Sequence, residues 1–233
     1  MTRLLASLRR EGLLLIRYKL VAVSVFVISF WILLLAFVPA DVRPSPDRLV
    51  PAFVVVNLVT TTFYFVVGLV LFERGEGMLT ALATTPLRTG EYLSARAVSL
   101  SLLAAVETLA VAFWFFGVGG WPQLVGGALF LGVIYTLLGL VAAARYDSIN
   151  EFLLPSIVLV TLLQLPLLPH FDVGSWWAFF WHPILPGLLL LRSAYVPGVT
   201  AELVLGLVGS AVWIWLSYRW ARHRFVTYVR AHG

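Results

Sequence analysis

The sequence contains six apolar segments, each about as long as a helix needs to be to cross a membrane. They cover residues 20–38, 51–72, 98–117, 124–144, 152–169 and 202–218. About 20 apolar residues in a helix cross roughly 30 Å of hydrocarbon. Hydrophobic residues make up 61% of the chain and charged residues only 12%, whereas soluble domains carry roughly twice that share of charge. The sequence therefore predicts an all-α, polytopic membrane protein, with residues 1–233 as one transmembrane domain.

Residues 1–19 precede the first apolar segment and have two chemically different sides. On a helical wheel, leucines and an isoleucine occupy one side, while Arg3, Arg10 and Arg17 recur every seven residues on the other. A helix of this kind lies in the membrane interface, with its apolar side toward the acyl chains. We expect an interfacial helix here, and an ordinary cytoplasmic extension is the alternative.

The basic residues are distributed unevenly between the loops. Of the 16 lysine and arginine residues, all but Arg43, Arg48 and Arg192 lie in the N-terminal segment, in the loop 73–97, after the fourth apolar segment or in the C-terminal tail. Loops rich in Lys and Arg stay on the cytoplasmic side of a membrane. The pattern predicts cytoplasmic N- and C-termini, which requires an even number of spans and fits six transmembrane helices.

Residues 170–200, between the fifth and sixth apolar segments, form an unusual external loop. They contain Trp176, Trp177 and Trp181, followed by an apolar stretch over 184–191 that is too short to span a bilayer. Tryptophan is enriched at membrane interfaces. The sequence therefore predicts an external re-entrant or interfacial hairpin between the fifth and sixth helices. Three prolines in the fifth segment predict a kinked or broken helix.

Several kinds of site have no counterpart in the sequence. A phosphate-binding loop needs a glycine-rich run followed by a lysine, but Lys19 is the only lysine and follows no such run. There is no cysteine, which excludes thiolate metal sites, and His170, Asp172 and His182 lack the spacing of a usual zinc site. We expect no ATP site, metal site or catalytic residue in this chain. Because the basic residues flank apolar runs, we also expect no nucleic-acid partner.

The loop after the second apolar segment has the pattern of a short amphipathic helix. Met78, Leu79 and Leu82 share one side of a helix over residues 76–84. This helix must end near Thr85, because the residue before a proline is pushed out of the helical region. A short helix held at the cytoplasmic ends of two spans has a suitable shape for docking on a soluble partner. A mere connector is the alternative.

The same segment resembles the coupling-helix region of ABC-2 type exporter permeases. The matching residues are Glu76, Gly77, Leu79, Leu82, Thr85, Pro86 and Leu87. Met78 departs from the pattern, since a small polar residue is frequent there in the family. A second match is His182-Pro183 with Arg192 after it, where family members often carry Asn-Pro and a later arginine. Within the family, Thr85 to Arg88 followed by Glu91 to Leu93 is similar to fluoroquinolone-export permeases of actinobacteria.

The resemblance implies a division of labour between chains. This chain would be an ABC-2 type transmembrane domain in a bacterial inner (plasma) membrane, paired with a second copy or a homologous permease. Its coupling region, 73–97, would seat on separate ABC ATPase subunits that hold ATP and Mg²⁺. The substrate would be an amphipathic small molecule, with multidrug or fluoroquinolone efflux as the expected function. The haem-exporter subunit of cytochrome c maturation shares the coupling pattern and is a minor alternative.

Four polar residues inside the apolar segments are candidates for a transport pathway: Asn57, Tyr64, Glu107 and Gln164. A carboxylate near the middle of a span, such as Glu107, costs several kcal/mol unless it is paired, protonated or facing water. Glu107 therefore predicts contact with a cationic or zwitterionic substrate. A carboxyl group hydrogen-bonded across a helix interface is the structural alternative. Asn57 and Tyr64 are expected to share a helical face, and such groups also bridge helices within bundles.

Two other classes of function stay open at this level. An ion-coupled secondary transporter or channel would need polar coupling groups near the middle of the membrane, and Glu107 is a candidate. An integral membrane enzyme would need a catalytic constellation, which the sequence does not contain. Binding of an ATPase by the cytoplasmic loops separates the exporter from both.

Overall fold

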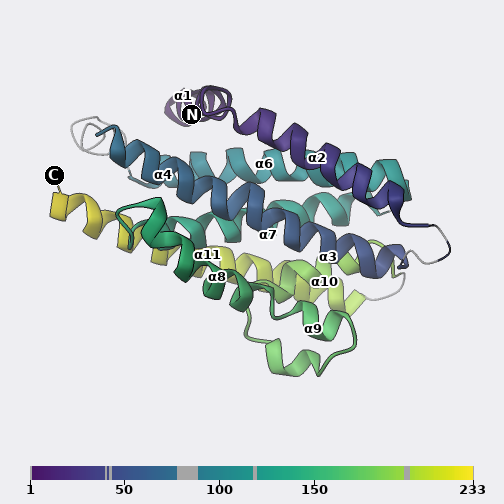
Figure 1. Ribbon diagram of the computed structural model, residues 1–233. Coiled ribbons are helices and arrows are strands. Elements are labelled where there is room, and N and C mark those ends of the chain that lie inside the picture. The colour runs from purple at the N-terminus through teal and green to yellow at the C-terminus, as the bar shows by residue number, and fades with distance from the viewer. Residues whose placement is uncertain are drawn as a thin grey trace.

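The computed structural model describes residues 2–39, 41, 44–77, 89–117, 120–196 and 200–232. Within these ranges every regular element is a helix. The long helices α2, α3 to α4, α6, α7 and α11 run alongside one another in an elongated bundle, and the two termini lie toward the same end of it (Figure 1). The predicted all-α class is confirmed.

The described helices follow one another in chain order. The first are α1 (Thr2–Arg17), α2 (Leu20–Phe37), α3 (Pro46–Leu58), η1 (Val59–Tyr64), α4 (Phe65–Gly75), α6 (Thr89–Phe116) and α7 (Trp121–Ala143). The last are α8 (Ile149–Gln164), α9 (Leu167–His170), η2 (Trp176–Phe179), α10 (Leu185–Ser193) and α11 (Thr200–His232). Of these, α3, η1 and α4 form one continuous helix of 30 residues, which a π-helical turn at η1 widens near its middle.

Among the described residues, five helices are long and apolar enough to cross a membrane: Leu20–Phe37, Pro46–Gly75, Thr89–Phe115, Trp121–Ala143 and Thr200–Thr227. The apolar helix α8 has only 16 residues. It starts near the end of the bundle that holds the termini and leads through α9 toward the other end (Figure 1). The count of six spans therefore stays a prediction, as do the interfacial position of α1 and the re-entrant position of residues 170–200.

The centre of the bundle is α7, which packs closely on its neighbours through glycines. A Cβ atom at Gly132 would lie 2.8 Å from the Cβ of Ser101 in α6. A Cβ atom at Gly127 would lie 2.6 Å from a methyl group of Leu191 in α10. Small residues allow this approach of helix backbones in membrane proteins. The short helix α10 is thereby held against α7, with most of its leucines buried.

In contrast, α2 and α8 lie on the outside of the bundle. The buried residues of α2 are Ser24 and Leu35, and those of α8 are Phe152 and Ser156. Large exposed apolar surfaces are typical of contact with lipid or with another chain. These two helices therefore have surface available for the membrane or for a partner.

Candidate functional site

A buried cluster of charged side chains joins α1, α4 and α6. The side chain of Arg96, in the second turn of α6, has no exposed surface, and Glu11 of α1 and Glu73 of α4 are also buried. The Arg96 Nη2 atom lies 2.7 Å from Glu73 Oε1, and its Nε atom lies 2.5 Å from Glu11 Oε2. A guanidinium group can hold two carboxylates in this way because its five N–H groups point in fixed directions. We call these residues, with Tyr92, the Arg96 cluster.

Tyr92 extends this cluster to the C-terminal helix. Its hydroxyl donates a hydrogen bond of 2.7 Å to Glu73 Oε2, and its ring lies under the guanidinium of Arg96, 5.0 Å away. The ring also stacks on Phe225 of α11, with centroids 5.1 Å apart. Burial raises the pKa of the Glu11 carboxyl above its ordinary value, while the Arg96 guanidinium opposes that rise. The Arg96 cluster thus joins α1, α4 and α6 and contacts α11 through Tyr92.

The Arg96 cluster lies at the base of the predicted coupling region, where it could respond to movement of that region. Glu73 and Arg96 lie at the two ends of the region 73–97, so their ion pair joins α4 to α6 at the base of the intervening segment. Glu11 adds α1, the helix with the amphipathic pattern, to the same junction. A movement of this segment would reach α1 and α6 through buried ionic contacts.

Most of the predicted coupling helix lies outside the described residues. That applies to Met78, Leu79, Leu82, Thr85 and Pro86, so their contacts stay a prediction.

The first two residues of the predicted coupling helix are described. Glu76 and Gly77 form the turn that ends α4, with a left-handed φ of 70° at Gly77, a conformation that favours glycine. Glu76 accepts a hydrogen bond of 3.0 Å from the Tyr18 hydroxyl. This contact joins the start of the segment to the linker between α1 and α2.

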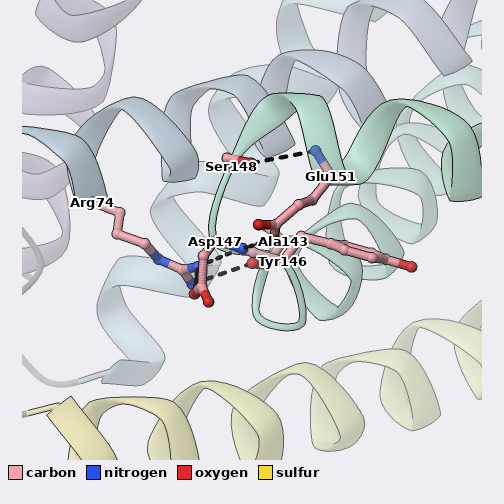
Figure 2. Close-up of polar contacts among 6 residues, drawn as sticks. All are labelled: Arg74, Ala143, Tyr146, Asp147, Ser148 and Glu151. Carbon is pink, nitrogen blue, oxygen red and sulfur yellow. Dashed lines mark hydrogen bonds and ion pairs between the residues drawn. The ribbon is translucent and has the colours of Figure 1, made fainter.

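Arg74, the neighbour of Glu73, reaches in another direction. Its guanidinium donates hydrogen bonds to the carbonyl groups of Ala143 and Tyr146 and lies 2.9 Å from a carboxylate oxygen of Asp147 (Figure 2). Ala143 is the last residue of α7, and a cation is favourable near free carbonyl groups at a helix C-terminus. Consecutive residues at the end of α4 therefore contact two different parts of the bundle.

The connector between α7 and α8, which Arg74 contacts, contains local hydrogen bonds of its own. The Ser148 hydroxyl accepts a hydrogen bond from the backbone N–H of Glu151, and the Glu151 carboxylate accepts one from the N–H of Asp147 (Figure 2). This arrangement is a variant of the capping box, which starts a helix by satisfying its free N–H groups. Arg74 thus contacts the point at which α7 ends and α8 begins.

Further along α6, Glu107 lies in a polar cluster of a different kind. The Asn57 side chain of α3 donates a hydrogen bond of 2.8 Å to Glu107 Oε2, and both residues are about 1% exposed. Ser24 of α2 and Thr61 of η1 lie close to the same carboxyl group. Within the described part of the chain, no basic residue forms an ion pair with Glu107. The geometry is that of a carboxyl group bonded across a helix interface.

Comparison with known proteins places the whole chain. Residues 2–232 match the model of the fluoroquinolones export permease protein family. The chain belongs to this family. It is 29% identical over 198 residues to fluoroquinolones export permease proteins of two Mycobacterium tuberculosis strains, CDC 1551 / Oshkosh and ATCC 25618 / H37Rv. Each alignment covers 84% of this chain and 82% of the relative. The resemblance found in the sequence is confirmed, and the protein is a membrane permease.

The four candidate pathway residues of the permease do not meet at one place. Asn57 contacts Glu107, whereas the Tyr64 hydroxyl lies 3.1 Å from Ser156 of α8. A π-helical turn lies between Asn57 and Tyr64, and the two residues contact different helices. Gln164 is the last residue of α8. Their roles in transport stay predictions.

The external match, His182-Pro183, lies where the broken fifth segment ends. The carbonyl group of Leu162 would normally accept from the residue four positions later, but Pro166 has no N–H. The His182 ring donates to this carbonyl through Nε2, at 3.1 Å, while its Nδ1 accepts from the Ile184 N–H. These contacts require the neutral ring, and burial lowers the pKa of His182. His182 therefore joins the end of α8 to the start of α10.

Arg192 fastens the other end of the external segment. Its Nη1 atom lies 3.7 Å from a carboxylate oxygen of Glu202 in α11, and its guanidinium lies over the ring of Trp176 in η2. A further ion pair, between Arg48 and Asp172, measures 2.6 Å. The loop 170–200 is thus tied to α3, α8 and α11.

The Arg96 cluster was not predicted from the sequence. The charge pattern assigns Arg74 and Arg96 to the cytoplasmic side and gives Glu11 and Glu73 no role. One signal was available, since Glu73 ends one apolar segment and Arg96 precedes the next. Opposite charges at adjacent ends of consecutive antiparallel helices are close enough to form an ion pair, so the pairing of Glu73 with Arg96 could have been predicted.

Proposed function

We propose that this permease is the transmembrane subunit of an ATP-driven exporter, with six spans and both termini in the cytoplasm. A separate ATPase chain, carrying ATP and Mg²⁺, docks on the segment between α4 and α6. Two permease copies, or one copy and a homologous permease, enclose the pathway. The names of the two relatives support amphipathic drugs of the fluoroquinolone class as substrates.

The observation that carries this proposal is how the base of the docking segment is fastened. Glu73 is joined through Arg96 to α6 and α1, and Arg74 is joined to the connector between α7 and α8. A force applied by the ATPase between these points reaches several helices of the bundle. Coupling of this kind works when the contacts have different free energies in the two states of the transporter.

The first experiment is affinity co-purification of the permease with the ATPase encoded nearest to it. We expect a stoichiometric complex that hydrolyses ATP. Leu79→Asp with Leu82→Asp should abolish binding of the ATPase while membrane insertion is retained, because both leucines lie on the apolar side of the predicted coupling helix. Thr80→Asp with Thr84→Asp adds the same charge on another side of that helix and should leave binding intact.

Two results would overturn the proposal. One is undiminished ATPase binding by the Leu79→Asp, Leu82→Asp variant. The other is drug export by the permease alone, driven by an ion gradient and abolished by Glu107→Gln, which would establish the ion-coupled alternative.

A further inference from the structure

A cavity of about 1200 Å³ lies between α7, α8 and α11. Its walls are apolar along most of their length, with Leu138 and Val141 from α7, Leu159 from α8, and Trp213 and Leu216 from α11. Small-molecule sites in proteins usually measure about 300–1000 Å³. The cavity is therefore larger than a compact drug requires, and its length follows the long axes of three helices.

The cavity is bordered on one side by a helix that is attached mainly near its ends. Near its start, α8 is held by buried Phe152 and by the hydrogen bond between Ser156 and Tyr64. At its end, the carbonyl of Leu162 bonds to His182. Leu159 and Leu163 of α8 line the cavity and are only partly buried against the core. An apolar occupant would bury their surface.

One end of the cavity is basic. Arg145, just after α7, and Arg224 of α11 both line it, with Tyr146 and Thr227 close by. On α11, Trp213 and Arg224 lie on the same face, about 16 Å apart along the axis at 1.5 Å per residue. Among the described residues that line the cavity there is no Asp or Glu, and neither arginine is in an ion pair with a described carboxylate. Both side chains are exposed and available to an anion.

We propose that this cavity binds an anionic phospholipid of the cytoplasmic leaflet. The phosphate lies between Arg145 and Arg224, and the acyl chains extend between α8 and α11 toward Trp213. Charge complementarity supports this occupant, because basic pockets between transmembrane helices on the cytoplasmic side bind anionic headgroups. The assignment of the basic end to the cytoplasm rests on the orientation given under the proposed function.

The headgroup position adjoins a contact of the docking segment. Arg145 and Tyr146 line the cavity, and the next residue, Asp147, is paired with Arg74. A bound lipid would therefore stabilise the connector that Arg74 contacts, in addition to filling the space beside α8.

Native mass spectrometry of the full-length permease in detergent tests this proposal. Dioleoyl-phosphatidylglycerol and dioleoyl-phosphatidylcholine are titrated separately, and the dissociation constants of the first bound lipid are compared. We expect the anionic lipid to bind at least about tenfold more tightly, because each of the two arginines near the headgroup should raise the affinity by up to about tenfold. Arg145→Gln with Arg224→Gln should remove that preference.

A matched control uses two arginines of the same helix that do not line the cavity. Arg219→Gln with Arg222→Gln removes the same total charge as the test variant, here entirely from α11, and should leave the preference unchanged. In a second test, Leu159→Trp with Leu163→Trp fills the apolar part of the cavity and should weaken binding of both lipids.

Three results would overturn the proposal. These are equal affinity for the two lipids, equal loss in the control variant, or tight binding of a fluoroquinolone that depends on Arg145 and Arg224 while the anionic lipid does not bind. The last result would make the cavity a substrate site. Because the measurement uses the permease alone, it can fail while the ATPase complex still forms, so failure of this inference is distinct from failure of the proposed function.

Discussion

Buried carboxyl groups contact or belong to α6 at two positions along its length, and the partners of these groups differ in charge. At Arg96, two carboxylates from α1 and α4 share a guanidinium at distances of 2.5 and 2.7 Å. At Glu107, 11 residues and about 16 Å further along the helix, the partner is the neutral amide of Asn57. The Arg96 site is ionic and joins helices at the end of the bundle. The Glu107 site pairs the carboxyl group with a neutral partner and joins helices near the middle of the bundle.

The difference follows from the cost of burying charge. At the Arg96 cluster the charges are buried, and each carboxylate offsets the cost of burial by pairing with the guanidinium. Near the middle of a span, neutral donors provide the least costly partner for a polar group. We infer that the Arg96 cluster transmits motion and that the Glu107 site holds helices together.

The largest effect should come from breaking the ionic site. Arg96→Gln leaves Glu11 and Glu73 buried without a cation, and loss of one partner from such a pair costs about 3–5 kcal/mol. Thermal unfolding in detergent, followed by tryptophan fluorescence, should show a markedly lower melting temperature. Arg219→Gln, at an exposed position of α11, is the control. Equal melting of Arg96→Gln and the wild type would contradict the ionic account.

Substitutions at the Glu107 site should lower the stability less than Arg96→Gln does, and the effect should differ between Asn57 and Glu107. Asn57→Leu removes the donor to the buried Glu107 and should cost about 1–3 kcal/mol. Glu107→Gln keeps an oxygen that can accept this hydrogen bond and should cost under about 1 kcal/mol. The same unfolding measurement ranks the two variants. If Glu107→Gln melts normally but abolishes export, Glu107 acts in transport and the distinction between the sites fails.

Arg74 tests whether a partly exposed ionic contact resembles the buried one. Arg74→Gln should cost about 1 kcal/mol, because it removes a cation from the C-terminal carbonyl groups of α7. Asp147→Asn should cost little, because that side chain is 81% exposed. Hydrogen exchange over residues 143–148 should become faster in the arginine variant alone. Equal changes in both variants would assign the contact to the ion pair rather than to the helix cap.

The smallest effect should be linked to pH, at the far end of the bundle. His182 is buried and its pKa lies below the ordinary value of 6.5, so folding favours its neutral form. The stabilisation is complete above pH 6.5 and is lost as the pH falls toward the lower pKa of the folded state. His182→Asn should flatten the fall in melting temperature below pH 6.5. An unchanged pH profile would show that His182 does not contribute, leaving His170, whose pKa burial also lowers, as the source.

Patterns along the chain predicted the class of fold and most helices, because long apolar runs have few alternatives to helices in a membrane. The fifth segment was predicted to be broken, and the structure divides it between α8 and α9 at Pro166. The π-helical turn at η1 was not predicted, because its residues include neither glycine nor proline.

The candidate site was predictable only in part. The match of residues 76–87 predicts a docking segment, which stays a prediction. The pairing of Arg96 with Glu11 and Glu73 was not predicted, because it joins residues 85 and 23 positions apart. Such contacts depend on how helices are arranged in space. The role of Glu107 illustrates the same limit, because its depth in the span was evident from sequence and its hydrogen bond to Asn57 was not.

The most direct test of the central claim replaces the whole Arg96 cluster with apolar groups. Glu11→Leu, Glu73→Leu, Tyr92→Phe and Arg96→Met together remove every charge, and such replacements often preserve stability. Fluoroquinolone accumulation in inverted vesicles is measured per ATP hydrolysed, with the ATPase subunit present. The account predicts a folded complex that hydrolyses ATP but transports at least about tenfold less drug per ATP, corresponding to the loss of about 1.4 kcal/mol of coupling. Wild-type transport per ATP in this variant would contradict it.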